Sequence, residues 1–196
     1  MIIKNNNLLF RPLEEKDLSY MVKWRNDPII NKFTASFKPI TLDEEINWFK
    51  NMQNNPSAEI YLGYDTSKDK PIGYANLKKI DNKKNELEVG CYICEHEYLN
   101  KGVSFIVAAS FLDYLFFKRN FNRAYMYIHE KHEIGIRAGV FMGAVFEGYL
   151  DKSIFRDAKT VIYSFYKDNY IKRKEDFINN PNFYNKLYRS LTYIEQ

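Results

Sequence analysis

The alternation of apolar and polar positions along the chain predicts a mixed α/β fold. Seven segments read as strands bounded by turn residues: residues 7–13, 58–64, 71–80, 86–93, 123–129, 144–150 and 160–166. Four segments repeat apolar residues at helical spacing: residues 13–27, 41–52, 104–118 and 133–142. Thr41 and Glu44, at the start of the second helix, have the spacing of a capping box. The order of these elements predicts an α/β fold with one mixed sheet in a single domain.

The last segment of the chain is basic and aromatic. We expect a domain that covers residues 1–170 and a C-terminal helical extension at residues 171–196. Leu187, Tyr188 and Leu191 fall at i, i+1 and i+4, the spacing of a helical stripe. Such a stripe would pack either back on the domain or against another subunit, so both a monomer and a homodimer stay open.

The composition favours a soluble protein of a reducing compartment. No stretch of the 196 residues approaches the ~20 apolar positions of a membrane span, and the N-terminus lacks the pattern of a secretory signal. Cys91 and Cys94 form a C-x-x-C without the second pair of a zinc site, so we expect free thiols, no metal and a cytoplasmic protein. The net charge of +4 is spread along the chain, which favours a small anionic ligand over nucleic acid.

A glycine-containing turn, "YLNKGVS", precedes a helix that is apolar almost all round. The first amides of a helix have no intrahelical acceptor, and together with the helix dipole they attract phosphate. Gly102 lets the backbone approach a ligand closely, and Lys101 adds positive charge. The turn is therefore a candidate phosphate site, although taken alone the pattern also fits an ordinary strand-to-helix turn.

Residues 71–150 resemble the GNAT acyltransferase superfamily, and the similarity extends over most of residues 8–170. The strand "ELEVGCYI", the glycine turn, the apolar helix, the strand "RAYMYIH" and the ending "MGAVFEG" follow one another in the order of that family. The resemblance implies a mixed, mostly antiparallel sheet flanked by helices, in which the strands at 86–93 and 123–129 splay apart. It also implies an N-acyltransferase with acetyl-CoA as co-substrate.

The resemblance assigns the coenzyme A site to two segments. Backbone amides would hold the pyrophosphate at Leu99, Asn100, Lys101, Gly102, Val103 and Ser104. The family usually has Gln or Arg at the first of these positions and Gly or Ala at the last, but backbone donors survive a change of side chain. The exposed backbone of Cys91, Tyr92 and Ile93 would pair with the amide groups of pantetheine.

The resemblance further implies that an amine attacks the thioester, helped by a base and by an acid that protonates the departing thiolate. Many relatives place a tyrosine acid nine residues before the glycine of "FEG", and here that position is Gly139. Glu88 and His132 are the candidate catalytic residues; each also fits an ordinary solvated position. Tyr92 and His129 are weaker candidates, because strand alternation leaves open which way they face.

Two glycines, Gly135 and Gly139, lie within the short helix predicted at residues 133–142. An interior glycine costs about 1 kcal/mol relative to alanine, so the pair needs a reason. Either the helix packs closely on a neighbouring strand, or the bare stripe leaves room for the sulfur end of the cofactor or for an acyl group larger than acetyl.

The first two helices cover the acceptor pocket in this superfamily. "WRNDP" followed by "ITLDEEINWF" resembles the branch that acetylates nucleotide-linked amino sugars, the pseudaminic-acid type, and similar text occurs in ribosomal-protein alanine and polyamine acetyltransferases. Arg25 would grip a phosphate, and Trp24 or Trp48 would stack on a sugar or base. The alternatives are a core position for Trp24 and a surface charge for Arg25.

We therefore expect a small-molecule amine as acceptor, with an amino-sugar nucleotide as the first choice. A peptide N-terminus and a polyamine are the enzymatic alternatives. A GNAT module that binds a coenzyme A thioester without turnover is the alternative outside catalysis.

Overall fold

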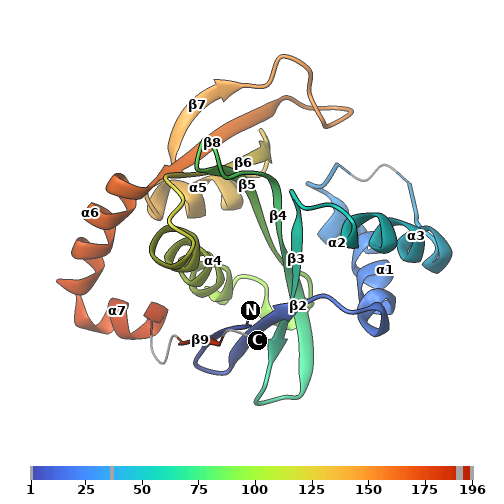
Figure 1. Cartoon of the computed structure of the whole chain (residues 1–196), viewed down its shortest axis with the longest axis horizontal. Helices are drawn as coiled ribbons and strands as arrows, with labels where there is room; N and C mark the ends of the chain where they lie inside the picture. The colour runs from blue at the N-terminus through green and yellow to red at the C-terminus, as the bar shows by residue number, and fades with distance from the viewer. Residues whose placement is uncertain (1, 36–37, 189–191, 195–196) are drawn as a thin grey trace.

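The computed structural model describes residues 2–35, 38–188 and 192–194 (Figure 1). Its strands form one open sheet in the order β7-β8-β6-β5-β4-β3-β2-β1-β9. The strands are β1 Ile2–Asn5, β2 Leu8–Pro12, β3 Glu59–Asp65, β4 Lys70–Asp81, β5 Glu86–Ile93, β6 Arg123–His129, β7 Val145–Tyr149, β8 Thr160–Tyr166 and β9 Thr192–Ile194. The helices are α1 Leu18–Asn26, α2 Pro28–Asn31, α3 Leu42–Gln53, α4 Val103–Asp113, α5 Glu133–Phe141, α6 Lys167–Ile178 and α7 Pro181–Tyr188. All paired neighbours are antiparallel except β5 and β6, which are parallel.

The α/β fold class predicted from the sequence is confirmed. Between residues 58 and 166 each predicted strand or helix begins and ends within one residue of an observed one, if the π-helical turn Tyr114–Lys118 is counted with α4. The first helix is shorter than predicted, because it begins at Leu18 after a 3-10 turn. It ends at Asn26, and the carboxylate of Asp27 then caps the separate helix α2 by accepting from the Ile29 amide at 2.8 Å.

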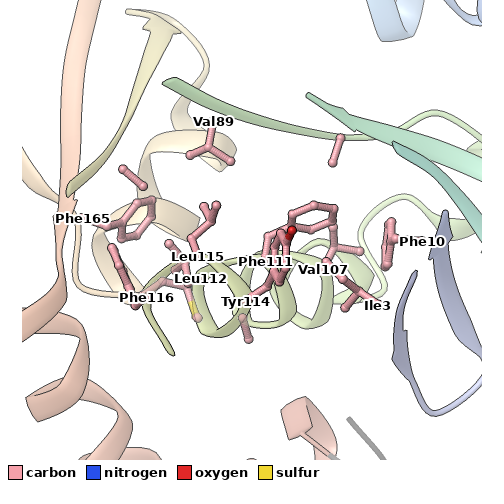
Figure 2. Close-up of a cluster of buried hydrophobic side chains, with 14 of the residues drawn as sticks. Ile3, Phe10, Val89, Val107, Phe111, Leu112, Tyr114, Leu115, Phe116 and Phe165 are labelled. Atoms are coloured by element: carbon pink, nitrogen blue, oxygen red, sulfur yellow. The ribbon is translucent and has the colours of Figure 1, made fainter. Parts of the chain in front are cut away.

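The main core lies between α4 and one face of the sheet. Figure 2 shows Val107 and Phe111 of α4, with Leu115 of the π-helical turn that follows it, pointing among side chains of the strands, and each of them is at most 1% exposed. The Phe111 ring meets that of Phe10 edge to face, with ring centroids 5.1 Å apart. This nearly all-apolar helix is buried because the sheet covers one side of it and the C-terminal helices contact another.

A second apolar cluster lies on the opposite face of the sheet, where α1 and α3 pack. Its buried members include Leu18, Met21, Trp24, Phe49 and Leu62. The side chains of α1 and α3 therefore form a wall over β3, β4 and β5, and this wall is where the acceptor pocket is expected.

The C-terminal segment packs back on the domain. The side chains of helices α6 and α7 that are buried against it are Tyr170, Phe177, Leu187 and Tyr188. The Tyr170 hydroxyl donates to Oδ1 of Asp113 on α4 at 3.1 Å. Strand β9 extends the sheet by pairing with β1. The expected domain boundary after residue 170 falls inside α6, and Leu191 of the predicted stripe lies outside the described residues.

No helix among the described residues is long and apolar enough to cross a membrane. They contain no group of three or more His, Cys, Asp or Glu side chains that would hold a metal ion. Cys91 packs in the α4 core and Cys94 in the opposite cluster, both as free thiols, and burial raises the pKa of Cys91 to about 12.

Candidate functional site

The sheet opens between β5 and β6. The two strands pair only from Glu86 to Glu88 on β5 and from Arg123 to Tyr125 on β6. Beyond that point β5 continues along β4, whereas β6 continues along β8. The backbone of Cys91, Tyr92 and Ile93 therefore faces an opening, as the predicted splay requires, and its peptide groups have an edge to offer an extended ligand.

The pleat of β5 sends alternate side chains to the two faces of the sheet. Leu87, Val89, Cys91 and Ile93 contact the α4 core. Glu88 and Tyr92 line the cavity on the other face. The structure thus settles which way Tyr92 points, a question that strand alternation alone left open.

The turn before α4 combines two left-handed residues. Asn100 has φ 59° and Gly102 has φ 75°, and Val103 then begins the helix. In the first turn the Phe105 amide bonds the Gly102 carbonyl at 3.1 Å, so the amides of Val103 and Ser104 are at the helix start, where no intrahelical acceptor exists. Side chains rarely adopt φ 75°, whereas glycine does so without strain, so the backbone conformation as well as access for a ligand favours glycine at position 102.

A lysine from the C-terminal helix lies beside this turn. A Cβ placed on Gly102 would be 4.0 Å from Nζ of Lys186 on α7. Lys101 and Lys186 are both exposed. The turn therefore joins helix-start amides with the ammonium of Lys186 and contains a lysine of its own, Lys101, which is an environment that favours a pyrophosphate. The β5 edge and this turn together fit coenzyme A.

A cavity of about 260 Å³ lies on the α1–α3 side of the sheet. Aromatic rings form much of its wall: Trp24, Phe33, Trp48, Tyr74, Tyr92, Tyr127 and Phe155. Charged side chains reach it at Arg25, Lys78 and Glu88. The cavity thus brings together the expected acceptor residues Trp24, Arg25 and Trp48 with Glu88 and Tyr92 of the open strand.

Trp24 has a core position with one edge on the cavity. Its side chain is 1% exposed, and its indole nitrogen donates to Oε1 of Glu95 at 2.7 Å. The ring stacks on Tyr74 with centroids 6.4 Å apart. The core interpretation therefore accounts for most of Trp24, and stacking on a substrate is confined to its exposed edge.

Arg25 is paired inside the protein. Its guanidinium donates to Oε2 of Glu45 on α3 and lies over the Trp48 ring, 5.7 Å from the centroid. Glu45 is 1% exposed, and its other oxygen, Oε1, has no hydrogen-bond partner among the described residues. Burial raises the pKa of Glu45 and Arg25 opposes that shift. Arg25 is thus a paired charge in the cavity wall, with 27% of its side chain exposed.

Glu88 occupies the last paired position before the opening. Its side chain is 15% exposed and forms an ion pair with Nζ of Lys79 at 2.9 Å. Lys79 in turn lies over the Tyr127 ring, 4.4 Å from the centroid. Glu88 is therefore a partly buried carboxylate at the junction of the opening and the cavity, in reach of a ligand in either.

His132 and His129 lie around Phe33 at one side of this region. The His132 ring stacks on Phe33 at 4.5 Å, and burial together with His129 lowers its pKa. The buried His129 accepts a hydrogen bond from the Lys131 amide through Nδ1 at 3.1 Å. His132 is therefore neutral near pH 7 and meets the cavity through Phe33.

The two glycines of α5 have packing reasons. A Cβ on Gly135 would lie 2.6 Å from the His132 ring, and one on Gly139 would lie 2.5 Å from Cε of Met126 on β6. The space beside each glycine is thus filled by a neighbouring side chain, which supports the close-packing alternative over room for a larger acyl group.

Several side chains of the site were not among the sequence candidates: Tyr74, Asn76, Lys78, Tyr127, Glu45 and Lys186. Tyr74, Asn76 and Lys78 face Tyr92, Gly90 and Glu88 across the β4–β5 pair. Their two-residue spacing would have placed them on one face, but the register of the pair was needed to say which face.

Comparison with known proteins agrees with this geometry. The family model described as "Acetyltransferase (GNAT) domain" matches residues 7–139. The structure of spermidine N-acetyltransferase from Vibrio cholerae in complex with CoA and spermine has a TM-score of 0.77 at 21% identity, over 85% of this chain and 99% of that chain. The dodecameric structure of the same Vibrio cholerae enzyme in an intermediate state has a TM-score of 0.72 at 20% identity, over 86% and 99%. No curated protein sequence gave a significant match.

Identities this low show a shared fold alone, whereas the family model covers more than half of the chain. The chain therefore belongs to the GNAT family of acetyltransferases, enzymes that take the acetyl group from acetyl-CoA.

Proposed function

We propose that this enzyme acetylates a primary amine of a small molecule bound in the cavity between α1, α3 and the sheet. The observation that carries the proposal is the position of Glu88 and Tyr92, which belong to the open strand β5 and also line the cavity. A donor held along β5 and an amine held in the cavity would meet at these two residues. Such positioning against an activated thioester removes much of the barrier to amide formation.

Two segments would hold acetyl-CoA. The backbone of Cys91, Tyr92 and Ile93 would pair with the pantetheine amides along the free edge of β5. The turn from Leu99 to Ser104 would hold the pyrophosphate on backbone amides, with Lys101 and Lys186 supplying charge. When bound, the thioester supplies an activated acetyl group and a thiol as leaving group.

Glu88 is the candidate base. Its carboxylate lies on the cavity wall and already accepts from the Lys79 ammonium at 2.9 Å. A substrate ammonium that takes the place of Lys79 would give up its proton to this carboxylate or to water beside it. His132 is the second candidate, because its lowered pKa leaves the imidazole neutral and able to accept a proton.

A polyamine is the acceptor class that the relatives support. The Vibrio cholerae enzyme with the same fold is a spermidine N-acetyltransferase, and its structure contains spermine. In the present cavity the aromatic walls would hold an ammonium group through cation–π contacts, and Glu88 would accept from another. No comparison supports the amino-sugar branch that the sequence suggested.

One observation still favours an acceptor that carries a phosphate. Arg25 and Lys78 both line the cavity, and Glu88 is the one acidic residue in its lining among the residues that the structure describes. Since a polycation gains from several carboxylates, this balance suits an amino-sugar nucleotide better. The oligomeric state stays a prediction of a monomer or homodimer, although the Vibrio cholerae relative forms a dodecamer.

A panel of amines separates these candidates. Thiol release from acetyl-CoA would be followed with spermidine, spermine, an amino-sugar nucleotide and an alanyl peptide. We expect turnover with one class of amine, and the amine that saturates the rate at the lowest concentration identifies that class. Binding of acetyl-CoA without thiol release for any amine would instead support the module without turnover.

A further inference from the structure

Many relatives carry the tyrosine that protonates the departing thiolate at a position that is Gly139 in this chain. The usual proton donor is therefore missing. Gly139 is buried, and Cε of Met126 lies in the space beside it. His132 lies stacked on Phe33. A donor must therefore come from another element that reaches the opening between β5 and β6.

Tyr92 projects from the open strand itself. It lies directly opposite Tyr74 on β4, and the two rings stack with centroids 4.6 Å apart at 18°. A Cβ built on Gly90 would come within 3.1 Å of the Tyr92 hydroxyl and 2.7 Å of Oδ1 of Asn76. The ring thus leans back along β5, and its hydroxyl lies over Gly90.

This position is next to the point where the sheet opens. Pairing of β5 with β6 ends at Glu88, so Gly90 is two residues into the free edge. The missing side chain of Gly90 leaves room for the hydroxyl, since a Cβ there would crowd the Tyr92 ring at 3.0 Å and come within 2.7 Å of Oδ1 of Asn76. The bare glycine, the amide of Asn76 and the stacked Tyr74 together fix the phenol beside the free backbone.

The hydroxyl keeps its proton at working pH. Burial, with a smaller contribution from Glu88, raises the pKa of Tyr92 to about 12, and a hydrogen bond from Asn76 opposes that rise. The carboxylate of Glu88 and the phenol of Tyr92 line the same cavity, one as a proton acceptor and the other as a donor.

We propose that the Tyr92 hydroxyl protonates the thiolate of coenzyme A, and so replaces the tyrosine that is absent at position 139. In this step the C–N bond forms and the C–S bond breaks, and the sulfur takes the phenolic proton. The nitrogen loses its proton to Glu88 or water, and the phenolate regains one from solvent. The assignment rests on the proposed transfer to an amine, and it adds the residue that completes the reaction.

Tyr149 offers a matched control. It lies on β7, is 54% exposed and does not line the cavity. The substitutions Tyr92→Phe and Tyr149→Phe each remove one hydroxyl and keep the ring. The general effect of losing a phenolic hydroxyl is then common to both variants, so a difference between them reports on the hydroxyl at position 92.

The first arm of the test measures binding without turnover. A hydroxyl that protonates the sulfur lies within hydrogen-bond reach of it, so wild type would bind CoA about threefold to tenfold more tightly than desulfo-CoA in calorimetry. We expect Tyr92→Phe to bind both equally and Tyr149→Phe to keep the preference. An unchanged preference in Tyr92→Phe would overturn the proposal, whether or not the correct amine is known.

The second arm measures chemistry with an amine that wild type acetylates. Loss of a general acid costs about 10²-fold or more in rate, so kcat of Tyr92→Phe would fall by that factor with KM for acetyl-CoA unchanged. Wild-type kcat in Tyr92→Phe, or an equal loss in Tyr149→Phe, would contradict the assignment. Failure of wild type itself to release thiol would count against the proposed function, while the first arm would still decide the place of Tyr92.

Discussion

Cε of Met126 lies where a side chain at Gly139 would begin, because a Cβ on that glycine would come within 2.5 Å of it. The space beside the position at which many relatives carry a tyrosine is therefore occupied by the end of the Met126 side chain, which a tyrosine would have to displace. We predict that Gly139→Tyr lowers the free energy of unfolding by about 1–3 kcal/mol through overpacking and leaves kcat no higher than in wild type.

The control is Gly139→Ala. Its single methyl meets only the flexible end of Met126, and the gain in helix propensity of about 1 kcal/mol offsets that contact. Chemical denaturation of both variants measures the difference. A tyrosine variant that is as stable as wild type and faster would show that the space beside Gly139 is open to a catalytic side chain.

Lys186 ties the C-terminal helix to the turn that is proposed to bind pyrophosphate. Its ammonium lies beside Gly102, so Lys186→Ala should raise the Kd for CoA about threefold to tenfold at low salt, and less at high salt. Lys50→Ala, which removes an equal charge from the exposed surface of α3, is the control. Equal CoA affinity of the two variants in calorimetry would show that Lys186 does not contribute to CoA binding.

Glu95 makes the stability of the α1 wall depend on pH. Although burial opposes it, hydrogen bonds from Lys23, Trp24 and Lys70 lower its pKa from 4.5 to about 2. A lowered pKa means that the unfolded chain binds the proton more readily. The contribution is therefore complete above about pH 4.5 and lost as the pH falls toward 2, and it amounts to about 3 kcal/mol.

The measurement is urea unfolding from pH 7 down to pH 3 for wild type and Glu95→Gln. We expect Glu95→Gln to be less stable at pH 7 and to lose less stability on acidification. Parallel curves for the two proteins would mean that Glu95 does not carry this part of the pH dependence.

The pair of Arg25 and Glu45 separates a structural charge from a substrate contact. Arg25→Ala would leave the carboxylate of Glu45 buried and unpaired, which lowers the free energy of unfolding by about 3 kcal/mol, whereas replacing both residues by leucine should lower it much less.

Lys78→Met removes a cavity charge without breaking the pair of Arg25 and Glu45. If the acceptor carries a phosphate, Lys78→Met raises its KM about tenfold, and an unchanged KM favours the polyamine.

Local patterns in the sequence were sufficient to predict most of the fold. Strands such as residues 86–93 alternate or run apolar between turn residues, and the helix at 41–52 carries its own capping box, which the structure contains. Strand β1 and strand β9 were not predicted. Ile3 pairs with Tyr193 at the far end of the chain, and no short window of sequence contains that relationship.

The site was harder to predict, because its geometry depends on partners that are distant in sequence. The pattern placed Glu88 and Tyr92 on one strand, but only pairing with β4 shows that they line the cavity with Asn76. The sequence showed the two glycines of α5, but not the side chains that occupy the space beside them, the His132 ring and the Met126 methyl. Arg25 was a candidate for a phosphate, and its internal partner Glu45 follows from the packing of α1 on α3.

The most direct test of the account follows the acetyl group itself. Acetyl-CoA labelled with ¹³C in the acetyl group would be incubated with the enzyme and the amine panel, and the products examined by mass spectrometry. The account predicts the label on the nitrogen of one class of small amine, with one thiol released for each amide formed. Label recovered only as acetate, or only in unreacted acetyl-CoA with every amine, would contradict it.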